Sequence, residues 1–251
     1  RDGCPRQSHE REAMTNQVDL SVIIFAFNEQ DNIAPVLSEV RRWLTENEPG
    51  AEIVFVDDGS TDDTSTEVEK TLAGMPHQLL RHDVNRGIGA ALKTGVRAAR
   101  GRWVTFLPAD GQIAPDAIQV LRDKASREDV DVVFSVYDHR DDGFHRKVLS
   151  AGVRGLILVV HGVRMQSDGP YLFKRELFDP EKLTPDTFFL NFEFPIRMLG
   201  AGVPSAITTI ECRPRHSGHS KSTGWKRIFG VAQDLLDLRV RRMKETFARQ
   251  G

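Results

Sequence analysis

The first half of the chain alternates between short apolar runs and helical patterns, and this alternation limits the possible folds more than any other feature. Runs rich in β-branched and aromatic residues are typical of buried strands. Five such runs occur, at residues 20–27, 51–56, 78–81, 103–107 and 130–136. Helical or helix-starting patterns follow the first four of them. This alternation predicts an α/β fold, with a mostly parallel sheet and helices on both faces.

The second half departs from this alternation, although no repeat or low-complexity linker separates the two halves. Residues 146–161 combine Val, Leu and Ile with basic residues, which is typical of a core helix or of an amphipathic helix lying on a membrane. Further elements are expected in the order strand, helix, strand, helix, at residues 171–174, 191–199, 205–211 and 225–247. A single domain is therefore predicted.

The composition fits one globular domain without a membrane span. A chain of 251 residues with 39% hydrophobic content can bury a normal core. No apolar run approaches the ~20 residues that a spanning helix needs, and the first residues lack the apolar segment of a signal peptide. We expect a disordered extension at residues 1–18, the α/β domain at 19–215, and a basic loop with an amphipathic helix, packed on or beside the domain, at 216–251.

The charge distribution indicates the kind of partner, and the cysteine content indicates the redox setting. The formal net charge of -2 does not indicate a nucleic-acid binder. From Arg213 onward, however, ten basic residues accompany only three acidic ones, which indicates an anionic partner such as a phosphate or a lipid surface. Cys4 and Cys212 lie near opposite ends of the chain without metal-ligand spacing, so a reduced, cytoplasmic setting is expected.

Four polar or glycine-rich loops follow the first four strands, with the sequences FNEQ, DDGST, NRGIG and PADGQ. Because ligands of parallel sheets lie beyond the carboxyl ends of the strands, all four loops should share one edge. In DDGST, Asp57 and Asp58 can accept hydrogen bonds from a nucleobase or a ribose. Capping of the next helix by Asp58 or Ser60 is the alternative. Two charges directly after a buried strand exceed what a cap requires, because burying charge is costly.

The two later loops each allow a functional and an ordinary interpretation. Gly87 and Gly89 can bring backbone N–H groups close to a phosphate, or can simply form a favourable turn. A dinucleotide-binding pattern is a weak match, because Leu92 occupies the place of its third glycine. Asp110 and Gln112 can offer oxygen ligands to a cation such as Mg²⁺, or can form a tight Asx turn. Their place on the shared edge favours the metal site.

Two further candidates lie in the second half. The loop at residues 213–221 contains two arginines, two serines and a lysine, a composition suited to a diphosphate but also common in solvated loops. Glu193 lies in a mostly apolar run, and it is either a general base with a raised pKa or part of the exposed side of an amphipathic helix. Five histidines without metal-ligand spacing are expected at the surface or in loops: His139, His145, His161, His216 and His219.

In this order, the four loops resemble those of the inverting family 2 glycosyltransferases of the GT-A fold, and most of all the dolichyl- or polyprenyl-phosphate sugar synthases. The similarity extends over about residues 20–238 and is strong in VDDGSTDDT and NRGIGAALKTGVRAARG. FNE resembles the Tyr-Asn-Glu of that family, with Phe27 in place of tyrosine. Pro108 stands where the family usually has the first of two acids, and Ser217 replaces an arginine of the later basic motif.

The resemblance implies roles for individual residues. Those that would hold the nucleoside are Phe27, Glu29, Asp57 and Asp58, with Asn85 and Gly87 close by. Mg²⁺ or Mn²⁺ would bind at Asp110 and Gln112 and bridge the diphosphate, while the groups that would close over the phosphates are Arg215, Ser220 and Lys221. Asp110 and Glu193 are the catalytic candidates. Glu193 would orient a lipid phosphate, or act as the base towards a hydroxyl acceptor.

The predicted function is inverting transfer of a sugar from a nucleotide diphosphate sugar, either a GDP- or a UDP-sugar, to a polyprenyl phosphate at the membrane surface. Peripheral contact at the cytoplasmic membrane face and no nucleic-acid partner are expected. Two alternatives stay open. One is a GT-A glycosyltransferase acting on a hydroxyl of a glycan, a small molecule or a protein; the other is a catalytically weak nucleotide-sugar binding protein, which Pro108 suggests.

Overall fold

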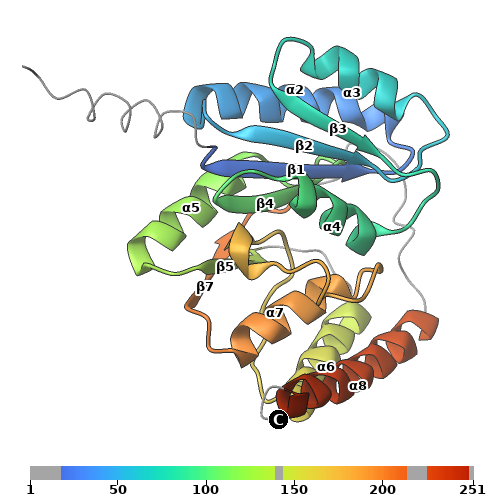
Figure 1. Ribbon diagram of the computed structural model, residues 1–251, viewed down its shortest axis with the longest axis vertical. Coiled ribbons are helices and arrows are strands. Elements are labelled where there is room, and N and C mark those ends of the chain that lie inside the picture. Colours follow the sequence, from blue (N-terminus) through green and yellow to red (C-terminus); the bar gives the residue numbers. More distant parts are fainter. Residues whose placement is uncertain (1–17, 139–143, 214–224, 249–251) are drawn as a thin grey trace, which may run out of the picture.

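A seven-stranded sheet forms the centre of the computed structural model (Figure 1), which describes residues 18–138, 144–213 and 225–248. The strands are β1 Leu20–Ala26, β2 Glu52–Asp57, β3 His77–Arg81, β4 Trp103–Pro108, β5 Val132–Tyr137, β6 Leu172–Lys174 and β7 Ser205–Ile210. Their order across the sheet is β3-β2-β1-β4-β6-β5-β7. Only β6 runs antiparallel to its neighbours among these strands, so the prediction of a mostly parallel sheet is confirmed.

Helices cover both faces of this sheet, which confirms the predicted α/β class. They are α2 Gln30–Asn47, α3 Thr64–Leu72, α4 Ile88–Ala98, α5 Asp116–Glu128, α6 Phe144–His161, α7 Leu190–Gly200 and α8 Trp225–Ala248, with a 3₁₀ helix, η1 Arg175–Leu177, after β6. Residues of α2, α3 and α5 pack in one hydrophobic cluster, and residues of α4 and α7 pack in another on the opposite face (Figure 1).

The central strand β1 shows how the sequence produces these two layers. Successive side chains of a strand point to opposite faces of its sheet. Val22 and Ile24 accordingly join the cluster under α2, α3 and α5, whereas Ile23 joins the cluster under α4 and α7. All three side chains are fully buried. A strand covered on both faces must be apolar throughout, which explains the continuous run at its position in the sequence.

Two elements begin two or more residues later than the sequence pattern predicts. The apolar residues that follow PADGQ predict a helix at residues 113–124, but this helix begins at Asp116, with Pro115 at its N-cap. Ile113 lies in the preceding loop and still packs into the core, so its apolar character reflected burial and not helix formation. The next strand begins at Val132 because Asp129, at the end of α5, adopts a left-handed conformation with φ 49° that turns the chain towards the sheet.

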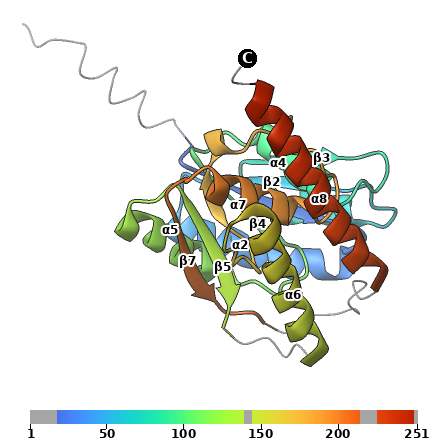
Figure 2. The same ribbon diagram turned by 90° about the horizontal axis from the view of Figure 1, so that it is seen from below.

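The end of the molecule away from α2 and α3 consists of α6, α7 and α8, and we call it the helical end (Figures 1 and 2). A third hydrophobic cluster joins these helices, with Ile157 from α6, Ile196 from α7, and Leu235 and Leu238 from α8. The α6 segment therefore contributes to a core, one of the two predicted alternatives. Within the described parts of the chain, no helix is both long and apolar enough to cross a bilayer.

His161, expected at the surface or in a loop, is instead the last residue of α6 and is buried. Its Nε2 lies 3.0 Å from the carbonyl oxygen of Leu235 in α8, so the ring joins the two helices. Burial lowers the pKa of His161, and the positive charges of Arg242 and Arg239 lower this pKa further. The ring is therefore a neutral structural contact at neutral pH.

Candidate active site

The four loops predicted to share an edge do meet at one edge of the sheet. In the parallel register, Ala26 of β1 pairs with Asp57 of β2, and Asp57 pairs with Arg81 of β3. Phe25 of β1 pairs with Pro108 of β4. The carboxyl ends of four neighbouring strands therefore lie side by side, and we call the loops that follow them the β1–β4 edge. Such an edge is where α/β sheets of this kind bind ligands.

The first loop, FNEQ, is fastened to the second, DDGST. The backbone N–H of Asn28 donates to Ser60 Oγ at 2.9 Å, and the N–H of Thr61 donates to Asn28 Oδ1 at 2.8 Å. Asn28 adopts a left-handed conformation with φ 54°. Phe27 is half-buried, and the carboxylate of Glu29 accepts a hydrogen bond from Asn32 Nδ2 at 2.7 Å. Both residues lie at the edge where a nucleoside was predicted to bind.

Asp57 is fully buried at the end of β2. Its carboxylate accepts hydrogen bonds from the Ser60 N–H, at 2.7 Å, and from the Ser65 hydroxyl. Arg81 lies 3.7 Å away and supplies a positive charge. These contacts make Asp57 the residue that shapes the DDGST turn. Its predicted contact with a nucleoside stays a prediction.

Asp58 holds the next loop, NRGIG, in place. Its carboxylate accepts from the backbone N–H groups of Gly87, at 2.8 Å, and Arg86, at 3.0 Å. It also lies 2.7 Å from Nδ1 of His82, whose Nε2 lies 2.9 Å from the Thr94 hydroxyl in α4. Asp58 therefore does not cap the helix that follows it, since the N-cap position of α3 is Asp63. It joins β2 to the start of α4 instead.

His82 is a residue of the β1–β4 edge that the sequence analysis missed. The ring is buried and lies between Asp58 and Thr94. Metal-ligand spacing, the criterion applied to the other histidines, carries no information about such a contact. The signal that could have found His82 is its position, because it directly follows β3 and so lies at the ligand edge.

The glycines of NRGIG allow the segment before α7 to pack closely against the start of α4. Gly87 has φ 94°, a conformation that side chains rarely adopt. A Cβ atom on Gly89 would lie 2.5 Å from the carbonyl oxygen of Thr187, and the Ala90 N–H donates to the carbonyl oxygen of Asp186 at 3.1 Å. Part of the N-terminus of α4 is thus covered by the segment before α7. Asn85, by contrast, is exposed at the edge.

The PADGQ loop forms the Asx turn that was the ordinary alternative for it. The Gln112 N–H donates to Asp110 Oδ1 at 3.2 Å, and Gly111 has φ 72°. A carboxylate oxygen in such a turn keeps further lone pairs, so the turn and a metal site are compatible. The Arg213 N–H donates to the Gln112 carbonyl oxygen at 2.8 Å, which brings the chain that follows β7 beside this loop.

The donor set at PADGQ suits Mg²⁺ or Mn²⁺ as a site shared with a ligand. Hard cations of this kind bind one or two carboxylates and complete their coordination with waters and substrate phosphates. Asp110 supplies a carboxylate and Gln112 an amide oxygen. No cluster of three or more His, Cys, Asp or Glu side chains that could hold a metal occurs among the described residues. A cation at Asp110 and Gln112 would complete its coordination with waters and with the phosphates of a bound ligand.

The predicted phosphate-binding residues Arg215, Ser220 and Lys221 lie outside the described residues. Their neighbour Arg213 is described, and its guanidinium lies 2.8 Å from the Glu39 carboxylate in α2. This hydrogen bond and ion pair raise the pKa of Arg213. Arg213 therefore fixes the start of the basic loop beside PADGQ, on the same edge as the other loops.

Glu193 lies in α7 and had two predicted alternatives, a general base or a residue on an exposed helix face. The side chain is fully buried, so it is not on an exposed helix face. One carboxylate oxygen lies 2.8 Å from Arg197 Nε and the other lies 3.0 Å from Arg241 in α8. Arg197 also binds Glu245 at 2.8 Å. Glu193 therefore links α7 to α8 through Arg241, and its catalytic role stays a prediction.

Asn191 is the polar residue of α7 that lies towards the ligand edge. Its Oδ1 accepts from the hydroxyl of Tyr171 at 3.4 Å, and the carbonyl oxygen of Tyr171 accepts from Thr105 Oγ1 of β4 at 3.1 Å. Burial raises the pKa of Tyr171, so its hydroxyl stays protonated and serves as a donor. The ring of Tyr171 also packs edge-on against Phe106 at 4.8 Å, which places the first turn of α7 near the end of β4.

The fold and the arrangement of these loops are those of GT-A glycosyltransferases. The chain superposes on glucosyl-3-phosphoglycerate synthase from Mycobacterium tuberculosis, solved with Mn²⁺, UDP and glucosyl-3-phosphoglycerate, with a TM-score of 0.66. The superposition covers 96% of this chain and 85% of the other, at 19% identity. The same enzyme with Mn²⁺, UDP and phosphoglyceric acid gives a TM-score of 0.67. Similarity at this level of identity establishes the fold.

The chain belongs to glycosyl transferase family 2. The family model matches residues 21–194, a stretch that contains all four loops of the β1–β4 edge.

Curated relatives have similar sequences over much of this chain. A dodecaprenyl-phosphate galacturonate synthase from Rhizobium johnstonii is 28% identical over 88% of the chain and 66% of the relative. A dolichyl-phosphate β-glucosyltransferase from Dictyostelium discoideum is 27% identical over 73% and 62%. A second dolichyl-phosphate β-glucosyltransferase, from Trichomonas vaginalis, is 33% identical over 63% and 54%. The chain thus spans between about half and two thirds of the length of these relatives.

Proposed function

We propose that the protein transfers a sugar from a nucleotide diphosphate sugar to a polyprenyl phosphate, with inversion at the anomeric carbon. Family membership and the lipid-phosphate sugar transferases among its relatives support this proposal. The observation that carries it is the meeting of FNEQ, DDGST, NRGIG and PADGQ at one edge of the sheet. That edge joins candidate nucleoside contacts to a candidate cation site.

The donor is held by the residues of the β1–β4 edge. Phe27, Glu29, Asp57 and Asp58 face the nucleoside, with Asn85 and Gly87 beside it. Asp58 and His82 keep NRGIG in a fixed position before the donor arrives, which lowers the cost of binding. Asp110 and Gln112 would hold a Mg²⁺ or Mn²⁺ ion, which would supply positive charge to offset the charge on the leaving diphosphate. The residues proposed to bind the phosphates are Arg215, Ser220 and Lys221.

The reaction forms one bond and breaks one bond at the anomeric carbon. An oxygen of the acceptor phosphate attacks this carbon, and the nucleoside diphosphate leaves from the opposite face with the bonding electrons. A phosphate monoester is already anionic at neutral pH, so the attack requires no general base. The binding of Glu193 by Arg197 and Arg241 supports this acceptor, because a hydroxyl acceptor would need a base.

The helical end offers a surface for peripheral contact with the cytoplasmic face of a membrane. On α8, the exposed apolar residues Leu236, Val240 and Met243 follow helical spacing. Val159 of α6 is 83% exposed. Arg239 is exposed beside the α8 stripe, and apolar residues flanked by basic ones suit an anionic lipid surface. This arrangement would bring the enzyme to an acceptor that resides in the bilayer.

A transfer assay with defined donors and acceptors tests this function. Labelled UDP-, GDP- and dTDP-sugars are mixed with the protein, Mn²⁺, and either polyprenyl phosphate in liposomes or a soluble sugar acceptor. We expect product only with polyprenyl phosphate and with one class of nucleotide. Product with the soluble sugar acceptor alone would reject polyprenyl phosphate as the acceptor and would indicate a hydroxyl acceptor instead. Nucleotide binding without product in any mixture would indicate a binding protein.

Liposome flotation tests the membrane surface separately. The wild-type protein should float with anionic liposomes, and Val240→Glu should bind several-fold less because a charge enters the apolar stripe. Val120→Glu is a matched control, since Val120 is exposed on α5 away from the helical end. A wild-type protein that stays in the soluble fraction would contradict the proposed membrane contact.

A further inference from the structure

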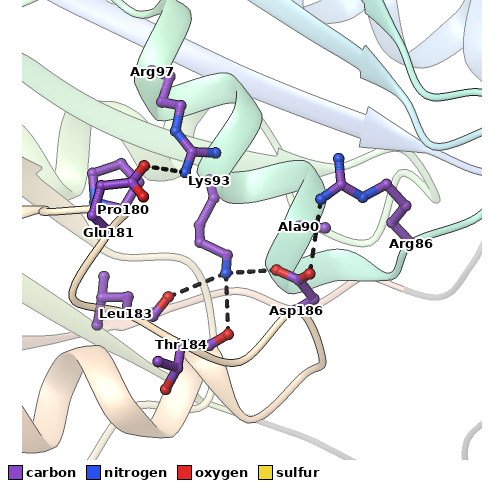
Figure 3. A pocket seen from close by; sticks show the side chains of 9 residues that line it. All are labelled: Arg86, Ala90, Lys93, Arg97, Pro180, Glu181, Leu183, Thr184 and Asp186. Carbon is purple, nitrogen blue, oxygen red and sulfur yellow. Dashed lines mark hydrogen bonds and ion pairs between the residues drawn. The ribbon is translucent and has the colours of Figure 1, made fainter.

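Residues 180–187, which precede α7, lie along one side of α4 and are attached to it by Lys93 (Figure 3). The ammonium group of Lys93 lies 3.1 Å from the carbonyl oxygen of Leu183 and 3.3 Å from that of Thr184. It lies 2.5 Å from the Asp186 carboxylate. A lysine has three N–H donors, and each has an acceptor here. Together with α4, this segment lines a cavity of about 260 Å³.

A second set of contacts attaches the same segment to the first turn of α4 without involving Lys93. The Ala90 N–H donates to the Asp186 carbonyl oxygen, and Gly89 leaves room for the Thr187 carbonyl oxygen. Two independent features of α4, a buried cation and a residue without Cβ, therefore hold one short stretch of chain against the NRGIG loop.

Lys93 differs from the two arginines that line the same cavity. Its side chain is 9% exposed, whereas those of Arg86 and Arg97 are 50% and 49% exposed. Arg97 pairs with Glu181, and Arg86 lies 3.8 Å from the Asp186 carboxylate. Exposed pairs contribute little. Removal of the Lys93 ammonium would instead leave the carbonyl oxygen of Leu183, a buried residue, without this donor, which is costly. Lys93 is therefore the main attachment.

The attached segment continues directly into α7. The Leu190 N–H donates to the Thr187 carbonyl oxygen at 3.2 Å, and the Phe189 N–H donates to Thr187 Oγ1 at 3.3 Å. Thr187 is thus part of the turn that starts α7. Asn191 follows in the first turn, near the end of β4. The position of this turn relative to the NRGIG loop depends on where residues 183–187 lie.

We propose that Lys93 is a positioning residue for the transfer reaction. By fixing residues 183–187 on α4, it sets the distance between the β1–β4 edge, where the donor is proposed to bind, and the first turn of α7, which lies near the end of β4. This inference rests on the proposed function. A small displacement between reacting groups is costly in rate, so Lys93 affects catalysis without touching either substrate.

Lys93→Met, which keeps the aliphatic side chain and removes the donors, tests this role. We expect kcat for transfer to polyprenyl phosphate to fall about tenfold or more, with the Kd for the nucleoside diphosphate changed less than about threefold. Hydrogen exchange in residues 183–190 should become faster. Asp186→Asn is the second variant if Lys93→Met folds poorly, and it should shift kcat and exchange in the same direction. Arg97→Gln removes only the exposed pair and should change kcat less than about twofold.

Two outcomes separate this inference from the function on which it rests. An active wild-type protein, together with a folded Lys93→Met variant of equal kcat and equal hydrogen exchange, overturns the positioning role alone. Equal loss of nucleotide affinity and kcat also overturns it, because the effect would then lie in donor binding. A wild-type protein without transfer activity contradicts the proposed function, and the positioning role is rejected with it.

Discussion

The β1–β4 edge and the helical end are stabilised in different ways. At the edge, side chains bind backbone N–H groups of neighbouring loops, as Asp58 binds those of Arg86 and Gly87. At the helical end, ion pairs join side chains that are far apart in the sequence, as Glu193 binds Arg241. The edge is thus shaped by residues that directly follow strands, whereas the helical end depends on charges brought together only by the tertiary fold.

Asp110→Asn should have the largest effect, and it lies at the edge. The amide can still accept the hydrogen bond from the Gln112 N–H, but the negative charge that attracts a cation is lost. We expect turnover to fall about 100- to 1000-fold, as for other losses of charge stabilisation in a transition state. Steady-state transfer assays at fixed Mn²⁺ measure this change. Asp123→Asn on α5 is the control, and unchanged turnover in Asp110→Asn would reject the metal role.

Glu193→Gln should destabilise the helical end strongly while leaving the chemistry intact. Removing the charge of the fully buried Glu193 carboxylate leaves the partly buried guanidinium groups of Arg197 and Arg241 without this counter-charge, and such a loss costs about 3 kcal/mol in unfolding free energy. Urea unfolding measures this change. Glu128→Gln removes a solvent-accessible pair with Lys124 and should cost less than about 0.5 kcal/mol. If Glu193→Gln instead keeps its stability and loses turnover, Glu193 is catalytic after all.

His82→Gln should weaken nucleotide binding by a smaller factor. The His82 ring orders Asp58, which in turn orders the NRGIG loop. Without the ring, the loop would become ordered only when the nucleotide binds, and this ordering would reduce the affinity. We expect the Kd for the nucleoside diphosphate to rise about three- to tenfold, measured by calorimetry. His77→Gln serves as the control, because His77 lies on β3 and its ring contacts only the nearby Met75 carbonyl oxygen among the interactions described for it. Equal Kd values for both variants would show that the loop does not need His82.

The smallest expected effect is a pH dependence at the helical end. The pKa of His161 is lowered in the folded protein, first by burial and then by Arg242 and Arg239. His161 therefore binds a proton more readily in the unfolded chain than in the folded protein. As the pH falls below the ordinary histidine pKa of about 6.5, protonation favours the unfolded chain, and the free energy of unfolding decreases. Thermal unfolding of wild type and His161→Gln across this range measures the difference. The wild-type Tm should fall more steeply towards acid; parallel curves would contradict the assignment.

The difference between the β1–β4 edge and the helical end also shows which features could be predicted from the sequence. Short apolar runs and strand–helix alternation are local patterns, and they predicted the sheet, its layers and the four loops of the edge. The burial of Glu193 could not be predicted in this way, because its partner Arg241 reaches it only when α7 packs on α8. Its other partner, Arg197, lies four residues further along α7. His161 was misjudged for the same reason, since its contact is with Leu235 of α8.

Lys93 illustrates a different kind of omission. In the sequence it is an ordinary charged residue within a helical pattern, and its acceptors at residues 183–186 are about 90 positions away. No period or motif links the two stretches. Asp57 and Asp58 show the converse, because the sequence identified them as unusual, but only the structure shows which protein groups their carboxylates bind.

The central claim is that a cation and a nucleoside diphosphate bind together at the β1–β4 edge. Nuclear magnetic resonance with UDP or GDP and paramagnetic Mn²⁺ tests this claim directly, because resonances close to the ion broaden. We predict selective broadening of the amides at residues 110–112 and of those near Asp58 and Gly87, with no such broadening at the helical end. Broadening centred elsewhere, or absent at residues 110–112 when nucleotide is bound, would contradict the claim.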